Sequence, residues 1–251
     1  MNLIAQGFAW LFDPAHSVST PGHPSIGVRI AEQFQYTGIS VLFVVLIAVP
    51  IGLAIGHTGR GRAIAIAASN ITRALPTLGL LSVLILLLGI GILPLTIVLV
   101  ILGIPPLLAG VYSGIESVDK MTVDAARAVG MTELQIIRKV EIPLSISLLL
   151  GGFRAATLQV FATATVGSYF AAGGIGRFLV DGLQTADYPQ MIAGAILVTG
   201  FALIIDGVLA LVQRFLVPRG VSRGSIDRRN TARGGSLPVV ASTRTLTMEG
   251  Q

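Results

Sequence analysis

The longest run of the chain without a charged side chain extends from Ala74 to Ile115. A helix needs about 20 apolar residues to cross the roughly 30 Å of hydrocarbon in a bilayer, so this run is long enough for two crossings. Gly89, Gly91 and Pro94 offer a break between them. Only 12% of the residues are charged, against about 25% in typical soluble domains. The chain is therefore predicted to be a membrane protein.

Runs of this kind predict five transmembrane helices. They are residues 37–56, 74–92, 95–112, the first two thirds of 142–176, and 190–213. The expected fold class is all-α, a polytopic membrane bundle with five core helices. The fourth and fifth runs each carry one charge, Arg154 and Asp206. Because an isolated charge on a membrane helix is costly, we predict that these two residues form an ion pair.

Composition divides the chain into three parts. Residues 1–36 are predicted to be an external segment at the membrane interface, with Trp10 and Phe12 at headgroup level. Residues 37–216 form the predicted transmembrane domain. Residues 217–251 are rich in Arg, Gly, Ser and Thr, cannot bury a core, and are predicted to be a disordered basic tail. This tail either attracts anionic membrane lipid weakly or is simply solvated.

The basic residues predict the orientation in the membrane. Most of the 17 Lys and Arg residues lie between spans one and two, between spans three and four, or after span five. Loops rich in Lys and Arg remain in the cytoplasm. The C-terminus and the loop between spans three and four are therefore predicted to be cytoplasmic, and the N-terminus external. Since this placement explains the net charge of +5, nucleic acid is not predicted as a partner.

The loop between spans three and four, residues 116–143, is polar and patterned for two short helices. Asp119 is placed to cap a helix that stops at Gly130, where a residue without a side chain adopts the left-handed conformation without strain. Thr132 and Gln135 have the spacing of a capping box that opens a second helix. The sequence therefore predicts a helix, a tight turn and a helix at the cytoplasmic face.

A longer pattern in this loop is similar to a known motif. Asp124-Ala125-Ala126, three residues, Gly130, nine residues and Val140-Glu141-Ile142-Pro143 resemble the EAA motif of ABC-importer permeases, which reads Glu-Ala-Ala, three residues, Gly, nine residues, Ile, any residue, Leu-Pro. The spacing matches throughout, and the substitutions preserve charge or apolarity. The resemblance implies that ATPase subunits couple to Asp124, Ala125, Ala126, Gly130 and Pro143. The small side chains of Ala125 and Ala126 would allow a groove of a partner protein to approach the helix closely.

Two further segments are similar to one branch of these permeases. Arg73 to Leu78, Arg-Ala-Leu-Pro-Thr-Leu, looks like Gln-Thr-Ile-Pro-Ser-Leu in glycine betaine and osmoprotectant permeases, and Ala171 to Gly176 looks like their Gly-rich external loop. The resemblance implies a MetI-like fold, a second permease subunit as homodimer or heterodimer, ATPase subunits and an extracytoplasmic substrate-binding protein. It implies an ATP-driven importer in a bacterial cytoplasmic membrane, for a small solute such as glycine betaine, choline or carnitine.

Candidates for lining the transport pathway are Arg73, Pro76, Thr77, Gln159 and Thr163. Pro76 and Thr77 lie where an unwound backbone would line a cavity. The alternative is a structural role, since Pro is frequent in membrane helices and Thr hydroxyls often bond to their own helix. Pro105 and Pro106 are interpreted as structural.

Several classes of chemistry are disfavoured. The chain has no cysteine and its three histidines are scattered, so neither a metal site nor a cofactor is predicted. No Walker A motif and no paired carboxylates occur in a spanning segment, so the chain is not predicted to be an enzyme and ATP must be hydrolysed by another chain. The alternatives left open are a permease for methionine or another small solute, and a proton-coupled secondary transporter.

Overall fold

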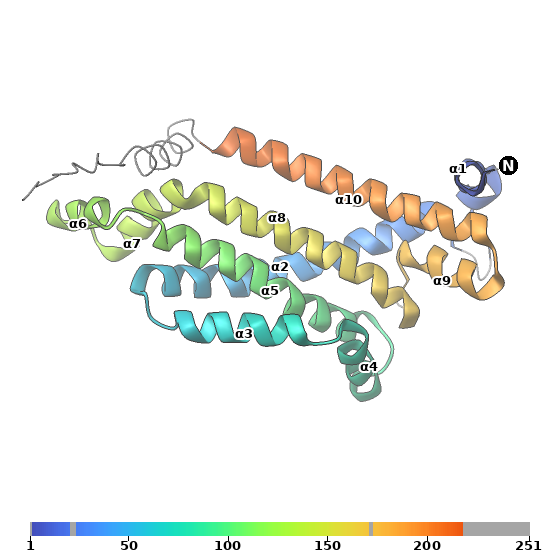
Figure 1. Cartoon of the computed structure of the whole chain (residues 1–251), viewed down its shortest axis with the longest axis horizontal. Coiled ribbons are helices and arrows are strands. Elements are labelled where there is room, and N and C mark those ends of the chain that lie inside the picture. Colours follow the sequence, from blue (N-terminus) through green and yellow to red (C-terminus); the bar gives the residue numbers. More distant parts are fainter. Residues whose placement is uncertain (1, 21–23, 171–172, 218–251) are drawn as a thin grey trace, which may run out of the picture. The chain divides into compact units, whose positions relative to one another are not determined.

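The computed structural model describes residues 2–20, 24–170 and 173–217, as drawn in Figure 1. The side chain of Arg73, residue Ala171 and the predicted tail from 218 onward lie outside the described residues. The helices are α1 (Leu3–Leu11), α2 (Ile26–Thr58), α3 (Arg62–Ala74), α4 (Thr77–Leu88), α5 (Ile92–Glu116), α6 (Lys120–Ala128), α7 (Glu133–Ile136), α8 (Ile142–Gly167), α9 (Gly176–Thr185) and α10 (Tyr188–Leu216). Short turns complete them: η1 (Pro14–Ser17), the π-helical η2 (Ile137–Glu141) and η3 (Ser168–Phe170).

Four of the described helical stretches are long and apolar enough to cross a membrane. They are α2, α5, α10 and the continuous run Glu133–Phe170, which contains α8. A fifth crossing results if α3 and α4 are counted as one broken span. The structure therefore confirms an all-α bundle with four to five spans, in which α2, α5, α8 and α10 correspond to the first, third, fourth and fifth predicted spans.

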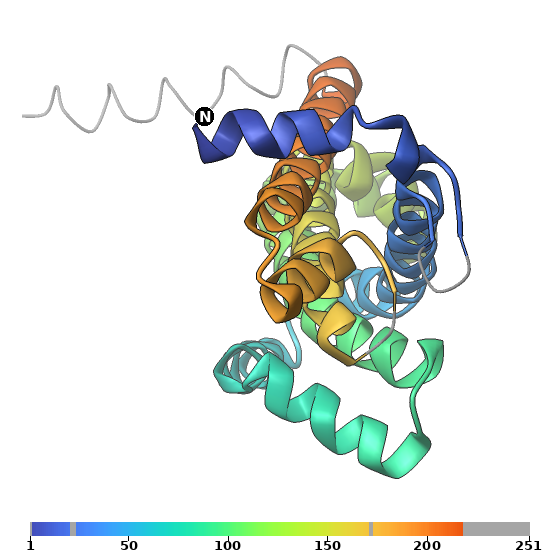
Figure 2. The ribbon, with the colours of Figure 1, turned by 90° about the vertical axis from the view of Figure 1, so that its right-hand side faces the viewer.

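The second predicted span is not one continuous helix. Helices α3 and α4 meet at an angle of 87°, and Figure 2 shows α4 running across the view whereas α2, α5, α8 and α10 are seen nearly end on. Pro76 has no N–H for the preceding turn and forces Leu75 into an extended conformation, with ψ at 127°. Of the predicted span 74–92 only Thr77–Leu88 forms helix α4, which is too short to cross a membrane alone. The broken span that is long enough includes residues 62–72 of α3, which the sequence places between spans one and two because they contain Arg62.

Helix α2 starts well before the predicted span at residue 37. Ser25 caps it by accepting a hydrogen bond from the backbone N–H of Val28 at 3.4 Å. Arg29 and Glu32 lie in its first turns and pair with each other at 3.0 Å. The two charges compensate each other within the helix. A search for uncharged residues passes over this segment and therefore starts the span too late in the sequence. The predicted boundary at residue 36 lies inside α2.

The core of the bundle is the packing of α5 against α2 and α8. Val44, Val98 and Val160, one from each helix, are fully buried there. A Cβ atom added to Gly110 on α5 would lie 2.5 Å from the Cα atom of Gly152 on α8. The two helices are therefore in backbone contact, which only residues without a side chain allow at this point.

Candidate functional site

Helix α6 and the turn after it have the local structure that the sequence predicts. The Oδ1 atom of Asp119 accepts a hydrogen bond from the backbone N–H of Met121 at 3.0 Å, which caps the first turn. Gly130 follows the helix with φ at +86°. Thr132 and Gln135 form the predicted capping box, with hydrogen bonds of 3.4 and 2.9 Å between side chains and backbone N–H groups. The caps thus fix the helix, the turn and the second helix by local contacts.

This loop has a small core of its own. Val118, Val123, Ala126 and Ile136 are buried together, whereas the side chain of Asp124 is 71% exposed. Ala126 packs inward because it lies three residues after Val123, on the same face of α6. Ala125 is exposed and Ala126 is buried, so of the two alanines only Ala125 lies on the surface of α6 in this chain.

Charged side chains join α6 to α7 on the surface of the loop. Arg127 donates two hydrogen bonds to the carboxylate of Glu133, at 2.8 and 3.1 Å, and a third to Asp124 at 3.0 Å. The hydrogen bond to Glu133 is the main cause that raises the pKa of Arg127 above its usual value. The Arg127 guanidinium therefore holds a permanent charge directly beside the exposed carboxylate of Asp124.

His57 connects this loop to the end of α2. Its Nδ1 atom lies 2.8 Å from Oε2 of Glu141, and its Nε2 atom lies 3.0 Å from Oε2 of Glu133. The side chains of His57 and Glu141 are 11% and 5% exposed. The sequence did not indicate either residue, because the three histidines are scattered along the chain and Glu141 occupies a position of the motif that accepts any residue. The available signal was an acidic residue at the start of an apolar span and a histidine at the end of another.

A cavity of about 330 Å³ opens at the break between α3 and α4. It is lined by Thr72, Leu75, Thr77, Leu102, Pro105, Pro106 and Gln159. Two predicted pathway residues, Thr77 and Gln159, therefore come together from α4 and α8. Pro105 and Pro106 also border the cavity, in addition to the structural role expected of them. The bend at Pro76 creates this space, because it turns α4 away from the line of α3.

The other pathway candidates have different surroundings. Thr163 is 6% exposed and accepts a hydrogen bond from the Nε2 atom of Gln159 at 3.2 Å, one turn before it on α8. Pro76 is exposed at the start of α4 and is not among the residues that line the cavity. Of Arg73 only the backbone is described, as part of α3. Thr163 therefore holds the amide of Gln159 in place.

Arg154 on α8 and Asp206 on α10 are joined by two hydrogen bonds, as an ion pair between the fourth and fifth predicted spans. Arg154 donates from Nε to Oδ1 and from Nη2 to Oδ2 of Asp206, each at 2.5 Å. The parallel geometry is the bidentate arrangement that Arg and a carboxylate favour. Gln213 supports the same helix pair by donating to the carbonyl of Ser147 at 2.9 Å.

The Gly-rich loop lies at the other end of α2 and α8 from residues 116–143, which are called the coupling loop below after their predicted role. Glu32 at the start of α2 accepts a hydrogen bond from the backbone N–H of Gly174 at 2.8 Å, and Ser168 donates to the carbonyl of Gly173 at 2.6 Å. Gly173 and Gly174 have φ of +84° and +81°. A Cβ atom at Gly173 would lie 2.5 Å from the carboxylate of Glu32. The loop is therefore held tightly to α2.

No group of three or more His, Asp or Glu residues in the described part of the chain is placed to hold a metal ion. What the geometry does provide is a capped two-helix loop at one end of the bundle and a cavity beside a broken helix. A helical membrane bundle with such a cavity is typical of a membrane transport subunit. The chain belongs to the family described as binding-protein-dependent transport system inner membrane component, which matches residues 20–219.

Members of this family are the membrane subunits of ABC importers, and ATP hydrolysis belongs to a separate partner chain. The chain is therefore a multi-pass permease subunit and not an enzyme. This membership sets aside the alternative of a proton-coupled secondary transporter.

Several curated proteins are similar over most of the chain. The glycine betaine/carnitine/choline transport system permease protein OpuCB of Bacillus subtilis is 35% identical over 193 residues, which are 77% of this chain and 89% of that protein. The choline transport system permease protein OpuBB of the same organism is 35% identical, with coverage of 76% and 88%. The osmoprotectant import permease protein OsmY of Salmonella typhimurium is 32% identical, with coverage of 72% and 78%.

Solved structures share the fold. An inward-facing form of the MetNI methionine ABC transporter has a chain with a TM-score of 0.67 and 22% identity, covering 77% of this chain and 96% of that one. An amino acid ABC transporter crystallised with histidines gives a TM-score of 0.61 at 20% identity, covering 74% and 92%. The chain therefore has the MetI-like permease fold.

Proposed function

We propose that this permease imports a quaternary-amine osmoprotectant such as glycine betaine, choline or carnitine. The observation that carries the proposal is the identity of 32% to 35%, over about three quarters of the chain, to permeases named for such solutes. The cavity at the α3–α4 break is compatible with it, because the described side chains that line the cavity are hydroxyl, amide and apolar groups. The alternative of a methionine permease has the same fold, so the fold does not separate the two.

An uptake assay tests the solute. A strain that lacks this chain should lose accumulation of radiolabelled glycine betaine at low external concentration and regain it when the gene is restored. Unlabelled choline and carnitine should compete with the label in the restored strain, and methionine should not. Competition by methionine alone would replace the proposed solute with the alternative.

The loop formed by α6, Gly130 and α7 is the proposed docking site for an ATPase subunit. Asp124 and Ala125 are exposed on α6. Ala126, on the opposite, buried face, packs into the small core of the loop and keeps the helix in position. Pro143 lies at the start of α8, directly after the π-helical turn η2, and the helical run from Glu133 continues through it into the spanning helix. Force applied to α6 would therefore pass through this turn into a spanning helix.

A second permease subunit is the proposed partner on the side of α4. Leu86 and Leu87 on this helix are 85% and 73% exposed. Thr77, at the start of the same helix, lines the cavity at the α3–α4 break. A second permease, either another copy or a different chain, would close this cavity into a pathway. Membrane lipid would cover the remaining apolar faces of the spans.

The proposed orientation places the coupling loop in the cytoplasm and the N-terminus and the Gly-rich loop outside, facing a substrate-binding protein. Thr185 and Ser117 are exposed at these two levels and the chain has no native cysteine. A Thr185→Cys variant should react with an impermeant thiol reagent on intact cells, and a Ser117→Cys variant only after permeabilisation. The reverse labelling pattern would overturn the orientation.

A further inference from the structure

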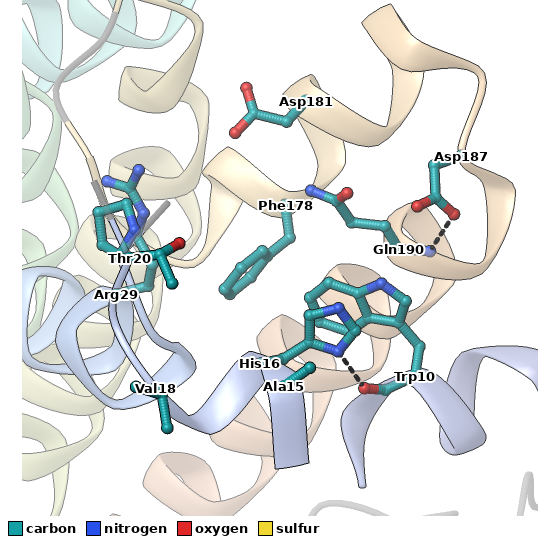
Figure 3. A pocket seen from close by; sticks show the side chains of 11 residues that line it. Trp10, Ala15, His16, Val18, Thr20, Arg29, Phe178, Asp181, Asp187 and Gln190 are labelled. Atoms are coloured by element: carbon teal, nitrogen blue, oxygen red, sulfur yellow. Dashed lines mark hydrogen bonds between the residues drawn. The ribbon is translucent and has the colours of Figure 1, made fainter. Parts of the chain in front are cut away.

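A second cavity, of about 400 Å³, lies between the N-terminal segment and the helices α9 and α10 (Figure 3). Its walls include Trp10, His16, Arg29, Phe178, Asp181 and Asp187. The volume is in the range of sites for small organic ligands. Trp10 and His16 precede the family match, which starts at residue 20, whereas the other four lie within it. The cavity is therefore not built from the shared part of the fold alone.

Aromatic rings form one wall of this cavity. The ring of His16 stacks on Trp10 with centroids 3.8 Å apart, and Phe178 meets Trp10 edge to face at 5.4 Å. The Nδ1 atom of His16 donates a hydrogen bond to the carbonyl of Trp10 at 2.9 Å, which fixes the ring in the stack. Phe178 is 7% exposed and anchored in the core. The wall is thus preorganised.

Negative side chains outnumber positive ones around the cavity, and the two signs lie on different sides of it. Asp181 pairs with Arg177 at 2.8 Å, and Arg29 pairs with Glu32 at 3.0 Å. Asp187 accepts a hydrogen bond from the backbone N–H of Gln190 at 3.1 Å. Asp187 therefore adds a negative charge to two pairs that are already balanced. In Figure 3 Arg29 lies on one side of Phe178 and Asp187 on the other.

We propose that this cavity binds a zwitterionic quaternary ammonium compound on the proposed outer side of the permease. Its methylated cation would lie against Trp10 and Phe178, toward Asp187, and its carboxylate would face Arg29. Quaternary ammonium groups bind aromatic faces because the ring quadrupole attracts a cation that holds no tight water shell. Arg29 has four N–H groups besides the one that bonds to Glu32, and can receive a carboxylate. The inference rests on the proposed function for the class of solute.

The single tryptophan of the chain provides a direct measurement, because Trp10 is itself part of the wall. The full-length chain in lipid nanodiscs is titrated with glycine betaine, with tetramethylammonium and with 3,3-dimethylbutyrate, in which carbon replaces the quaternary nitrogen. We expect a saturable change in fluorescence with the first two ligands and none with the third. No saturable change, or an equal response to the carbon analogue, would overturn the proposal.

Two variants locate the site. Phe178→Leu removes the aromatic face, and Asp187→Asn removes the charge while keeping an oxygen that caps α10. Each should weaken glycine betaine binding by about tenfold. Phe12→Leu is the matched control, since Phe12 is 81% exposed and does not line the cavity, and it should bind as the unmodified chain does. If Phe178→Leu fails to fold, the binding measured for Asp187→Asn alone tests the proposal. Unchanged binding of glycine betaine by Asp187→Asn would show that the cation does not lie near Asp187.

The uptake assay separates this inference from the proposed function. If glycine betaine is transported but does not change the fluorescence of Trp10, the outer site is wrong and the proposed function stands. If another solute is transported and glycine betaine neither enters nor competes, the proposed function fails whatever the titration gives.

Discussion

The Nδ1 atom of His57, at the end of α2, lies 2.8 Å from a carboxylate oxygen of Glu141, at the start of the α8 segment. The two residues are far apart in the sequence and nearly buried. The second ring nitrogen faces Glu133, which Arg127 ties to α6. A continuous polar chain therefore connects the first spanning helix to the coupling loop. When both ring nitrogens carry protons, His57 donates to both carboxylates at once.

We expect the His57→Leu variant to lose stability. It leaves the carboxylate of Glu141 buried without its partner, which costs about 3 kcal/mol in comparable buried pairs. The measurement is the apparent melting temperature of the purified chain in detergent. The control is Arg62→Gln, which breaks the exposed pair of Arg62 with Glu116 and should change stability by less than about 1 kcal/mol. Equal effects of the two variants would show that the buried pair contributes no more than a surface one.

Substitution of Gly130 should separate backbone strain from bulk at the coupling loop. Gly130 has φ at +86°, and no atom of the described residues lies within 4 Å of an added Cβ. Gly130→Ala and Gly130→Glu therefore carry the same strain, about 1 kcal/mol, and only the glutamate adds a large side chain to the proposed docking surface. We expect Gly130→Ala to retain part of the uptake and Gly130→Glu to lose both uptake and copurification of the ATPase. Normal copurification and uptake by Gly130→Glu would contradict the docking assignment.

The Arg154–Asp206 pair should show coupling in a double-mutant cycle. Each single neutralisation, Arg154→Gln or Asp206→Asn, leaves one charge on a membrane helix without its partner, so the yield of folded protein should fall. The double variant should recover part of that loss. Yields are compared by fluorescence-detected size-exclusion chromatography. A double variant as poor as the two single losses combined would mean that the residues do not stabilise each other.

The glycine contact between α5 and α8 should be intolerant of side chains. Gly110→Val would place its Cβ atom 2.5 Å from the Cα atom of Gly152, and overpacking of this kind costs about 1 to 3 kcal/mol. The melting temperature should fall accordingly. Gly207→Ala on α10 is the matched control, because no described atom lies within 4 Å of its added Cβ. If both variants have the same melting temperature as the unmodified chain, the close approach of α5 and α8 is not needed for stability.

Features that depend on neighbours in the chain could be predicted from the sequence. The caps at Asp119 and Thr132, the left-handed turn at Gly130 and most of the spans follow from local hydrogen bonding and from the length of apolar runs. The Arg154–Asp206 pair was also predictable, because the cost of an isolated charge in lipid leaves few partners for each. These inferences need no knowledge of how the helices pack.

The sequence by itself determined that this chain is a helical membrane protein with a capped coupling loop, because local bonding and hydrophobic length do not depend on the fold. Only the tertiary structure decided that Ala126 faces inward, that His57 meets Glu141 and Glu133, and that two cavities exist. It also decided that the chain bends at Pro76, so that α4 meets the preceding helix α3 at an angle of 87°. Each of these depends on which face of one helix meets another, and that is settled by packing between segments far apart in the sequence.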